Sequence, residues 1–266
     1  MAADAAWLVV AADALGRHAL VLYAALLLLL PAAVGWGARR LLQDGRRDGR
    51  RGGRRVGNPF GIPCRTVATS VGVGVAIFAT LTTALSTGDG LRAADLAFAN
   101  AVHASLPAAA LPPFAALTHL ADTATLTGLS ITMALLMAAV RQPALAVGWA
   151  LALAGNGVLN RSLKALIGRA RPPDQVAAWA EAGFSFPSGH SSGAVVACGL
   201  LAYTVLRLLP ARWHAAVLAA AVALAWSIGA SRVFLGVHFA SDVLAGFVSG
   251  GLWLLLCISL LARRPR

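Results

Sequence analysis

Charged residues are scarce in this sequence of 266 residues, of which 12% are charged and 59% are hydrophobic. A soluble domain needs more polar surface than this to face water. The apolar residues also gather in blocks of about 20, the length that crosses the hydrocarbon core of a bilayer. The composition therefore argues against a large soluble domain and predicts an all-α protein, a polytopic bundle of membrane-spanning helices.

Cysteine and acidic residues are also few, with three cysteines and ten Asp and Glu residues in the whole chain. Cys64, Cys198 and Cys257 do not have the spacing of metal ligands. Two of them lie in apolar segments, where cysteine usually packs as a small hydrophobic residue. No carboxylate-rich metal cage is visible in the sequence either. We therefore expect no metal site and no other cofactor.

The formal net charge of +12 comes almost entirely from arginine, because Lys164 is the only lysine among the 22 basic residues. Eight arginines lie between Arg39 and Arg55, in a stretch typical of a short loop. No aromatic residue interrupts this stretch, as a surface for single-stranded nucleic acid would require. Such a block is typical of the cytoplasmic side of a membrane protein, where it can also contact anionic lipid headgroups. The expected partner is the bilayer and not a nucleic acid.

Seven apolar stretches predict membrane spans. The first, at residues 19–38, forms with the arginine-rich loop a predicted N-terminal unit at 1–58. The other six predict a core domain at 59–266, and they lie at about 66–86, 121–140, 143–161, 190–209, 213–231 and 238–262. Residues 87–120 contain three prolines and apolar residues at mixed spacing, which predicts short helices lying at the membrane interface.

The arginine-rich loop also predicts the orientation of the chain, since positive loops face the cytoplasm. Counting spans from this loop places both ends of the six-helix core inside and the N-terminus outside. The same count leaves Arg161, Lys164, Arg169 and Arg171 together at an outer helix end, against the orientation rule. An anion bound at the outer face would account for positive charge at that end.

Three motifs carry the candidate chemistry. They are Lys164-x6-Arg171-Pro172, then Pro187-Ser188-Gly189-His190 at the start of a hydrophobic helix, and Ser231-Arg232-x5-His238-x3-Asp242 across the outer ends of the last two helices. In this order and spacing they resemble the signature of the type-2 phosphatidic acid phosphatase superfamily. That superfamily also contains bacterial undecaprenyl-diphosphate phosphatases, glucose-6-phosphatase and the soluble vanadium haloperoxidases. The resemblance covers about residues 60–262.

The basic and small residues of these motifs suit phosphate binding. Phosphoryl transfer needs positive charge and fixed hydrogen-bond donors around three equatorial oxygens. Arg171 and Arg232 can each offer a planar fork to phosphate, and Lys164 adds a point charge. Ser188 precedes a helix whose N-terminus presents free N–H groups to an anion, and Gly189 lets the backbone approach closely. Ordinary capping explains Ser188 equally well, and both functions can hold at once.

The two motif histidines and the aspartate suit nucleophilic catalysis. His238 and Asp242 are four residues apart and therefore lie on one face of the last helix. An aspartate that enters the hydrocarbon region is costly and needs a partner. The carboxylate can hold one imidazole nitrogen of His238 while the other nitrogen attacks phosphorus. His190 would then protonate the departing oxygen and afterwards activate water.

Several polar residues near the motifs have simpler explanations. The motif does not require Arg161 or Arg169, and we expect both to extend toward lipid headgroups. His103, His119 and Asp122 could line the path by which the substrate arrives, but their interfacial position explains them equally well.

The resemblance implies a membrane enzyme that removes the terminal phosphate of a lipid through a phosphohistidine on His238, without a metal. Undecaprenyl diphosphate is the first expected substrate, because the alanine- and arginine-rich composition indicates a GC-rich bacterium. Phosphatidate, phosphatidylglycerol phosphate and lipid A phosphate stay open. The expected location is the bacterial inner membrane, with the site at its periplasmic face.

Two other functions compete with this hypothesis. One is a member of the haloperoxidase branch, against which the membrane spans count because those proteins are soluble. The other is a catalytically silent protein that binds or moves lipids. Such a protein would be expected to lack His238, His190 or Asp242, and all three are present.

Overall fold

The computed structural model describes residues 2–49, 64–173 and 182–262, and in these ranges all regular structure is helical. In chain order, with η for short 3-10 helices, the elements are α1 (Ala2–Arg17), α2 (Ala19–Gly49), α3 (Cys64–Thr87), α4 (Gly90–Ser105), η1 (Ala108–Ala110), α5 (Leu111–Thr118), η2 (His119–Ala121), α6 (Thr123–Ala139), α7 (Pro143–Ile167), α8 (Gly189–Leu206), η4 (Ala211–Trp213), α9 (His214–Phe234) and α10 (Ala240–Ala262).

Six described helices are long and apolar enough to cross a membrane, namely Ala19–Arg40, Val67–Thr87, Pro143–Ile167, Gly189–Leu206, Ala211–Phe234 and Ala240–Ala262. The stretch predicted at 121–140 corresponds to α6. This helix reaches spanning length only together with the segment Ala108–Ala121, from which it is bent by 47°. The predicted all-α, polytopic membrane bundle is thus confirmed, with a broken helix pair as its seventh candidate span.

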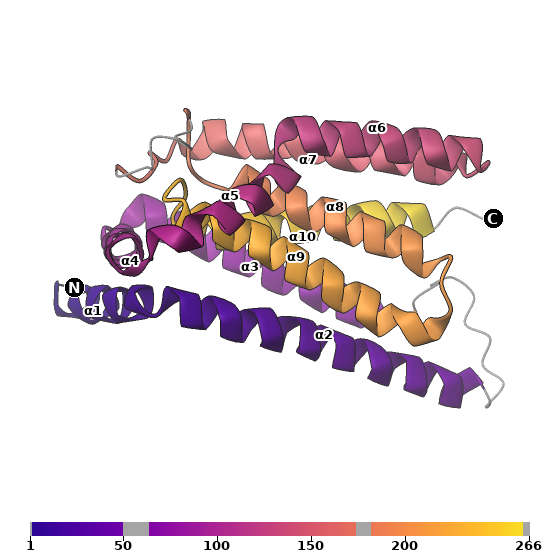
Figure 1. The fold of residues 1–266 in the computed structure, drawn as a ribbon, viewed down its shortest axis with the longest axis horizontal. Helices are drawn as coiled ribbons and strands as arrows, with labels where there is room; N and C mark the ends of the chain where they lie inside the picture. The colour runs from indigo at the N-terminus through magenta and orange to yellow at the C-terminus, as the bar shows by residue number, and fades with distance from the viewer. Residues whose placement is uncertain (1, 50–63, 174–181, 263–266) are drawn as a thin grey trace.

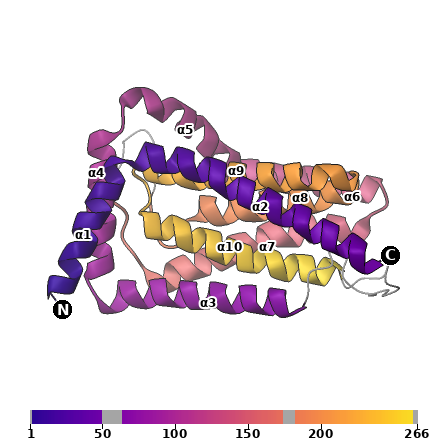
Figure 2. The ribbon, with the colours of Figure 1, turned by 90° about the horizontal axis from the view of Figure 1, so that it is seen from below.

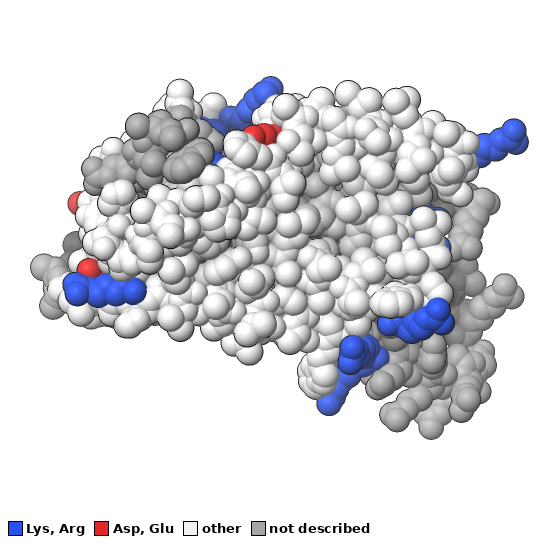
Figure 3. All heavy atoms as spheres, viewed as in Figure 1, with Lys and Arg blue, Asp and Glu red and all other residues white. Residues whose placement is uncertain are grey.

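The long helices lie side by side along the longest axis of the molecule (Figure 1). In this bundle α8 packs against both α9 and α10, α7 packs against α6 and α8, and α3 packs against α10. On the face seen in Figure 3, the basic side chains lie toward the two ends and a broad middle region carries no charge. This distribution suits a molecule whose middle faces lipid.

The short helices gather at one end of the bundle, where α1 packs against α4 (Figure 2). The short helices predicted for residues 87–120 are therefore present, as α4, η1, α5 and η2. Helix α1 was not predicted, because its 16 residues are too few to cross a bilayer and the first predicted span begins only at residue 19.

The arginine-rich stretch is partly helical, which corrects the prediction of a loop beginning at Arg39. Helix α2 continues through this stretch as far as Gly49, and the remainder of it lies outside the described residues. Arginine and leucine are good helix formers, so a helix that has left the apolar region can continue without a stop signal. Helix α2 packs against α9, where the Tyr23 and Ser227 hydroxyls are 3.0 Å apart.

Close packing of α10 against α8 brings two of the motifs together. A Cβ atom on Gly246 would lie 2.6 Å from the carbonyl oxygen of Ser188, and one on Gly250 would lie 2.6 Å from that of Ser192. Only glycine allows the two backbones to approach this closely. The start of α10, which carries Asp242, therefore lies directly beside the start of α8.

Candidate active site

The three motifs meet at the same end of the bundle because each lies where a helix ends or begins. Helix α7 ends at Ile167, and its C-cap Gly168 adopts a left-handed conformation with φ of 66°. The chain then runs without regular structure through Arg171. The second motif opens α8, and the third crosses the loop between α9 and α10. Long helices thus hold the site rigidly, while its functional side chains come from their ends.

His238 and Asp242 form a buried pair at this end, with Asp242 fully buried. The Nδ1 atom of His238 lies 3.4 Å from Oδ2 of Asp242. The same carboxylate oxygen accepts hydrogen bonds from the backbone N–H of Phe239, at 2.9 Å, and from the hydroxyl of Ser185, at 2.5 Å. The carboxylate is therefore fixed, and it orients the imidazole through Nδ1.

Ser185 is a site residue that the sequence motifs did not identify. It is fully buried, and its hydroxyl oxygen lies 3.2 Å from Nδ1 of His238 while its hydroxyl donates to Asp242. The only signal in the sequence was its position two residues before Pro187 of the second motif. Ser185 thus connects the segment before α8 to the histidine and aspartate of the third motif.

The second imidazole nitrogen of His238 faces Arg171. Nη1 of Arg171 lies 3.3 Å from Nε2 of His238 and also donates to the carbonyl of Val237 at 2.9 Å. A guanidinium can only donate hydrogen bonds, so this contact assigns the proton of the neutral ring to Nδ1 and a lone pair to Nε2. The nitrogen predicted to attack phosphorus therefore points at an arginine predicted to bind phosphate.

The surroundings of His238 keep it neutral. Burial lowers the pKa of His238 to about 4, and the charges of Arg232 and Arg171 lower it as well, while Asp242 acts in the opposite direction. A neutral imidazole is the nucleophilic form, and at neutral pH the site holds His238 almost entirely in that form.

The other predicted phosphate ligands surround this pair. Lys164 donates from Nζ to the carbonyls of Phe184, at 2.5 Å, and Ser185, at 3.4 Å. Arg232 is 2% exposed, and its Nη1 donates to the Thr118 hydroxyl at 2.5 Å, while its carbonyl accepts from the His238 N–H at 3.2 Å. The first and third motifs thus bring three cationic side chains to the neighbourhood of one histidine.

Ser188 caps α8 in the structure, as ordinary capping predicts. Its hydroxyl oxygen accepts from the N–H of Ser191 at 3.4 Å, and its own N–H donates to the Asp242 carbonyl at 2.9 Å. A Cβ atom on Gly189 would lie 3.1 Å from the side-chain oxygen of Asn160. The N-terminus of α8 therefore approaches Asp242 closely.

His190 binds a different carboxylate. Its Nε2 lies 2.9 Å from Oδ1 of Asp122, whose Oδ2 lies 2.7 Å from Nδ1 of His119. Side-chain exposure rises along this chain, from 15% for His190 to 40% for Asp122 and 64% for His119. Asp122 and His119 thus connect His190 to solvent, while their predicted place on the path of the substrate stays a prediction.

Arg169 corrects a prediction, because it does not extend toward lipid headgroups. It is 9% exposed and pairs with two carboxylates, through Nη2 with Asp95 at 2.7 Å and through Nη1 with Asp242 at 2.5 Å. Helix α7 has already ended at Gly168, so the side chain of Arg169 turns inward, and its guanidinium lies 4.2 Å from the Phe239 ring. Two buried carboxylates require such a counter-charge.

Asp95 extends this ion-pair network to helix α4. It accepts from the N–H of Ser241 at 3.2 Å and from the hydroxyl of the same residue. Burial raises the pKa of Asp95, while Arg169 and Ser241 act to lower it. The chain Asp95–Arg169–Asp242 thus links the short helix α4 to the carboxylate that orients His238.

Replacing Arg169 with Gln is expected to destabilise the protein by about 3–5 kcal/mol, because Asp95 and Asp242 would remain buried without a counter-charge. Thermal unfolding in detergent measures the effect, with Arg161→Gln as the matched control at an exposed position of α7. Adding Asp95→Asn to Arg169→Gln is expected to recover part of the loss. An unfolding temperature unchanged by Arg169→Gln would contradict the role of this ion pair.

The carboxylates at the site are each held by histidine or arginine side chains. Among the described residues, no group of three or more His, Cys, Asp or Glu side chains is placed to hold a metal ion. Independence from metals remains a prediction that only an activity measurement can test.

The sequence is similar to known lipid phosphatases over part of its length. The model of the PAP2 superfamily matches residues 143–266. Phosphatidylglycerophosphatase B of Bacillus subtilis is 43% identical over 95 residues, which are 35% of this chain and 46% of that protein. Lipid A 1-phosphatase of Rhizobium etli is 37% identical over 120 residues, which are 41% of this chain and 47% of that protein. The chain thus spans about half the length of the curated relatives it matches.

A solved structure extends the similarity to most of the fold. The crystal structure of the first transmembrane PAP2 type phosphatidylglycerolphosphate phosphatase from Bacillus subtilis matches with a TM-score of 0.70 and 29% sequence identity. The match covers 74% of this chain and 98% of that one. The bundle described above is therefore a transmembrane PAP2 fold.

Proposed function

Because the chain belongs to the PAP2 superfamily, we propose that it is a lipid phosphatase that hydrolyses a terminal phosphate through a phosphohistidine on His238, without a metal. The observation that carries this proposal is the state of the His238 ring. Its Nδ1 is held by Asp242, and its Nε2 lone pair faces Arg171. This is the arrangement that a nucleophilic imidazole needs in front of a bound phosphate.

The reaction has two steps in this proposal. Nε2 of His238 attacks the terminal phosphorus, the bond from phosphorus to the lipid oxygen breaks, and His190 gives a proton to that oxygen. Water then attacks the phosphohistidine and gives a proton to His190, which restores both histidines and releases inorganic phosphate. Each step is an in-line displacement at phosphorus, and His190 acts first as acid and then as base.

The phosphate oxygens are held by the cationic residues around His238. We assign this role to Lys164, Arg171 and Arg232, together with Ser188 and the backbone N–H of Gly189. The support for it is the placement of the three side chains near His238 and of the α8 N-terminus beside Asp242. Positive charge fixed before the substrate arrives stabilises the charge that develops on the oxygens.

The substrate is proposed to be a membrane lipid with a terminal phosphate, and the chain to lie in a bacterial inner membrane with the site at its outer face. Undecaprenyl diphosphate is the substrate predicted first from the sequence. The names of the relatives add weight to phosphatidylglycerol phosphate and lipid A phosphate. Phosphatidate completes the set of candidates.

Phosphate release by the detergent-purified protein in excess EDTA tests the proposal on these four lipids. We expect release from at least one of them at a rate that EDTA does not reduce, because the cations of the site replace a metal. A magnesium-dependent phosphatase in the same assay is the control for complete chelation. Strict dependence on added magnesium would contradict the proposed mechanism. Lipid transfer without phosphate release would favour the catalytically silent alternative.

A further inference from the structure

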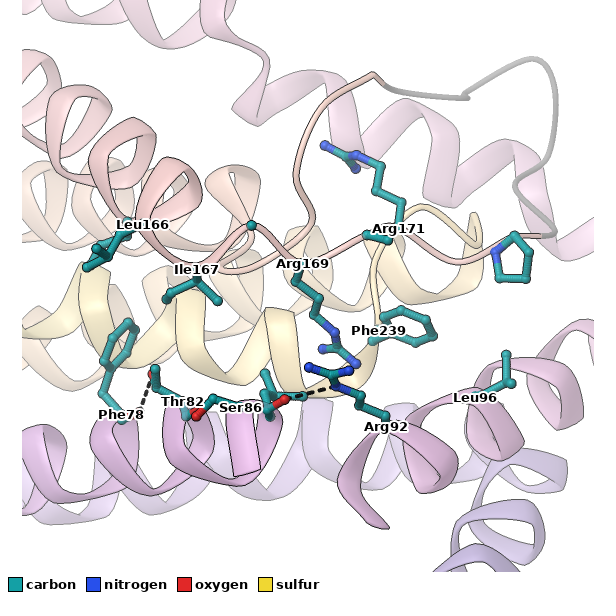
Figure 4. A pocket seen from close by; sticks show the side chains of 15 residues that line it. Phe78, Thr82, Ser86, Arg92, Leu96, Leu166, Ile167, Arg169, Arg171 and Phe239 are labelled. Carbon is teal, nitrogen blue, oxygen red and sulfur yellow. Dashed lines mark hydrogen bonds between the residues drawn. The ribbon is translucent and has the colours of Figure 1, made fainter. Parts of the chain in front are cut away.

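A cavity of about 630 Å³ lies between α3, α4 and the end of α7 (Figure 4). Its walls are mainly apolar, with Phe78 and Leu85 from α3, Leu96 from α4, and Leu163 and Ile167 from α7. Three arginines also line it, Arg92 on α4 and Arg169 and Arg171 in the segment after α7. An apolar cavity with a cationic side has the two properties that bind a lipid carrying a phosphate.

The cavity borders the candidate active site. Arg171 lines it and also contacts Nε2 of His238 at 3.3 Å. Phe239, the residue after the nucleophile, lines it as well, and its ring packs against Arg169. When the terminal phosphate of a lipid lies at His238, the groups that precede this phosphate in the lipid can therefore lie in the cavity.

The charges of the three arginines are balanced differently. Arg169 is neutralised by Asp95 and Asp242. Arg92 donates from Nε to the Leu85 carbonyl at 2.9 Å, and none of the described carboxylates lies within ion-pair distance of it. Figure 4 shows its guanidinium beside that of Arg169, on the lining of the cavity. The fork of Arg92 is thus held in place by a neutral carbonyl, and no carboxylate among the described residues balances its charge.

We propose that Arg92 binds a second phosphate group of the substrate lipid, one that the enzyme does not hydrolyse. The inference rests on the proposed function and narrows its substrate class to lipids with two phosphates. The diester phosphate of phosphatidylglycerol phosphate and the inner phosphate of a lipid diphosphate both precede the terminal phosphate along the molecule. Phosphatidate has a single phosphate. Because this phosphate must lie at His238 to be hydrolysed, phosphatidate has no second anion for Arg92 to bind.

The test compares two lipids with identical acyl chains, phosphatidate and phosphatidylglycerol phosphate, in mixed micelles at equal mole fraction. For Arg92→Gln we expect kcat/KM on phosphatidylglycerol phosphate to fall about tenfold, through KM, since a charge-assisted hydrogen bond is lost. The value on phosphatidate is expected to change less than about twofold. Arg161→Gln is the matched control, because Arg161 is exposed and does not line the cavity.

Two results would overturn the inference. Equal losses on both lipids would mean that Arg92 has only a structural role, and no loss on either would mean that it binds no substrate phosphate. In both cases the wild-type protein still releases phosphate, so the proposed function stands. If the wild-type protein releases phosphate from none of the four candidate lipids, the proposed function fails and the inference with it.

Discussion

Replacing His238 with Ala is expected to lower phosphate release on the order of 10⁴-fold or more, because the proposed covalent intermediate forms on this side chain. The variant keeps Arg171, Arg232 and Lys164, so it should still bind the lipid. The direct measurement is rapid quenching with radiolabelled lipid phosphate. Wild type should carry label on histidine, stable in base and labile in acid, and the variant should carry none.

The matched control for this variant is Ser241→Ala, which removes a buried hydroxyl that contacts Asp95 one residue away from Asp242. It disturbs packing at the same helix end but leaves both imidazole contacts in place. His238 would be excluded as the nucleophile if His238→Ala kept more than about 1% of the wild-type rate and unfolded at the wild-type temperature.

The lowered pKa of His238 makes a second consequence of this mechanism measurable. With a pKa of about 4, His238 binds a proton only well below the range of an ordinary histidine, so it stays neutral above about pH 5. Any loss of kcat/KM between pH 7 and pH 5 should therefore not arise from protonation of His238. If the fall of kcat/KM in this pH range disappears in His190→Ala, it belongs to His190.

Much of the site could be predicted from the sequence because its motifs are local. The spacing of four residues correctly predicted that His238 and Asp242 lie close together, but the prediction that both lie on one face of the last helix was wrong. Helix α10 begins at Ala240, so His238 lies in the loop before it, and Asp242 reaches back from the first turn of the helix. The spacing of apolar blocks placed the motifs at helix ends, where the structure has them. Ser188 starts α8 as its residue type predicts.

The residues that sequence analysis missed act over long separations in the chain. Ser185 contacts Asp242 across 57 positions, and Arg169 reaches Asp95 across 74 positions. No periodicity links such residues, and an arginine at a helix end normally extends toward headgroups. Only the stop of α7 at Gly168 and the tight packing of α10 on α8 turn Arg169 inward.

His190→Ala is expected to separate the two proposed chemical steps, because His190 would act as an acid in the first and as a base in the second. On a lipid phosphate, phosphate release should fall about 10³-fold, since the lipid oxygen would leave without a proton. With 4-nitrophenyl phosphate the leaving group is stable as an anion and needs no acid. The variant should therefore release about one nitrophenolate per enzyme in a rapid burst and then slow down, as the phosphohistidine waits for a base.

Two further variants decide between a chemical and a structural role for His190. His103→Ala removes an exposed histidine of α4 and should change neither substrate's rate. Asp122→Asn keeps a hydrogen-bond partner for Nε2 of His190 but removes the charge between His190 and His119, so we expect a smaller loss than in His190→Ala and a shifted pH profile. Equal losses on both substrates, with no burst, would mean that His190 only holds the start of α8 in place.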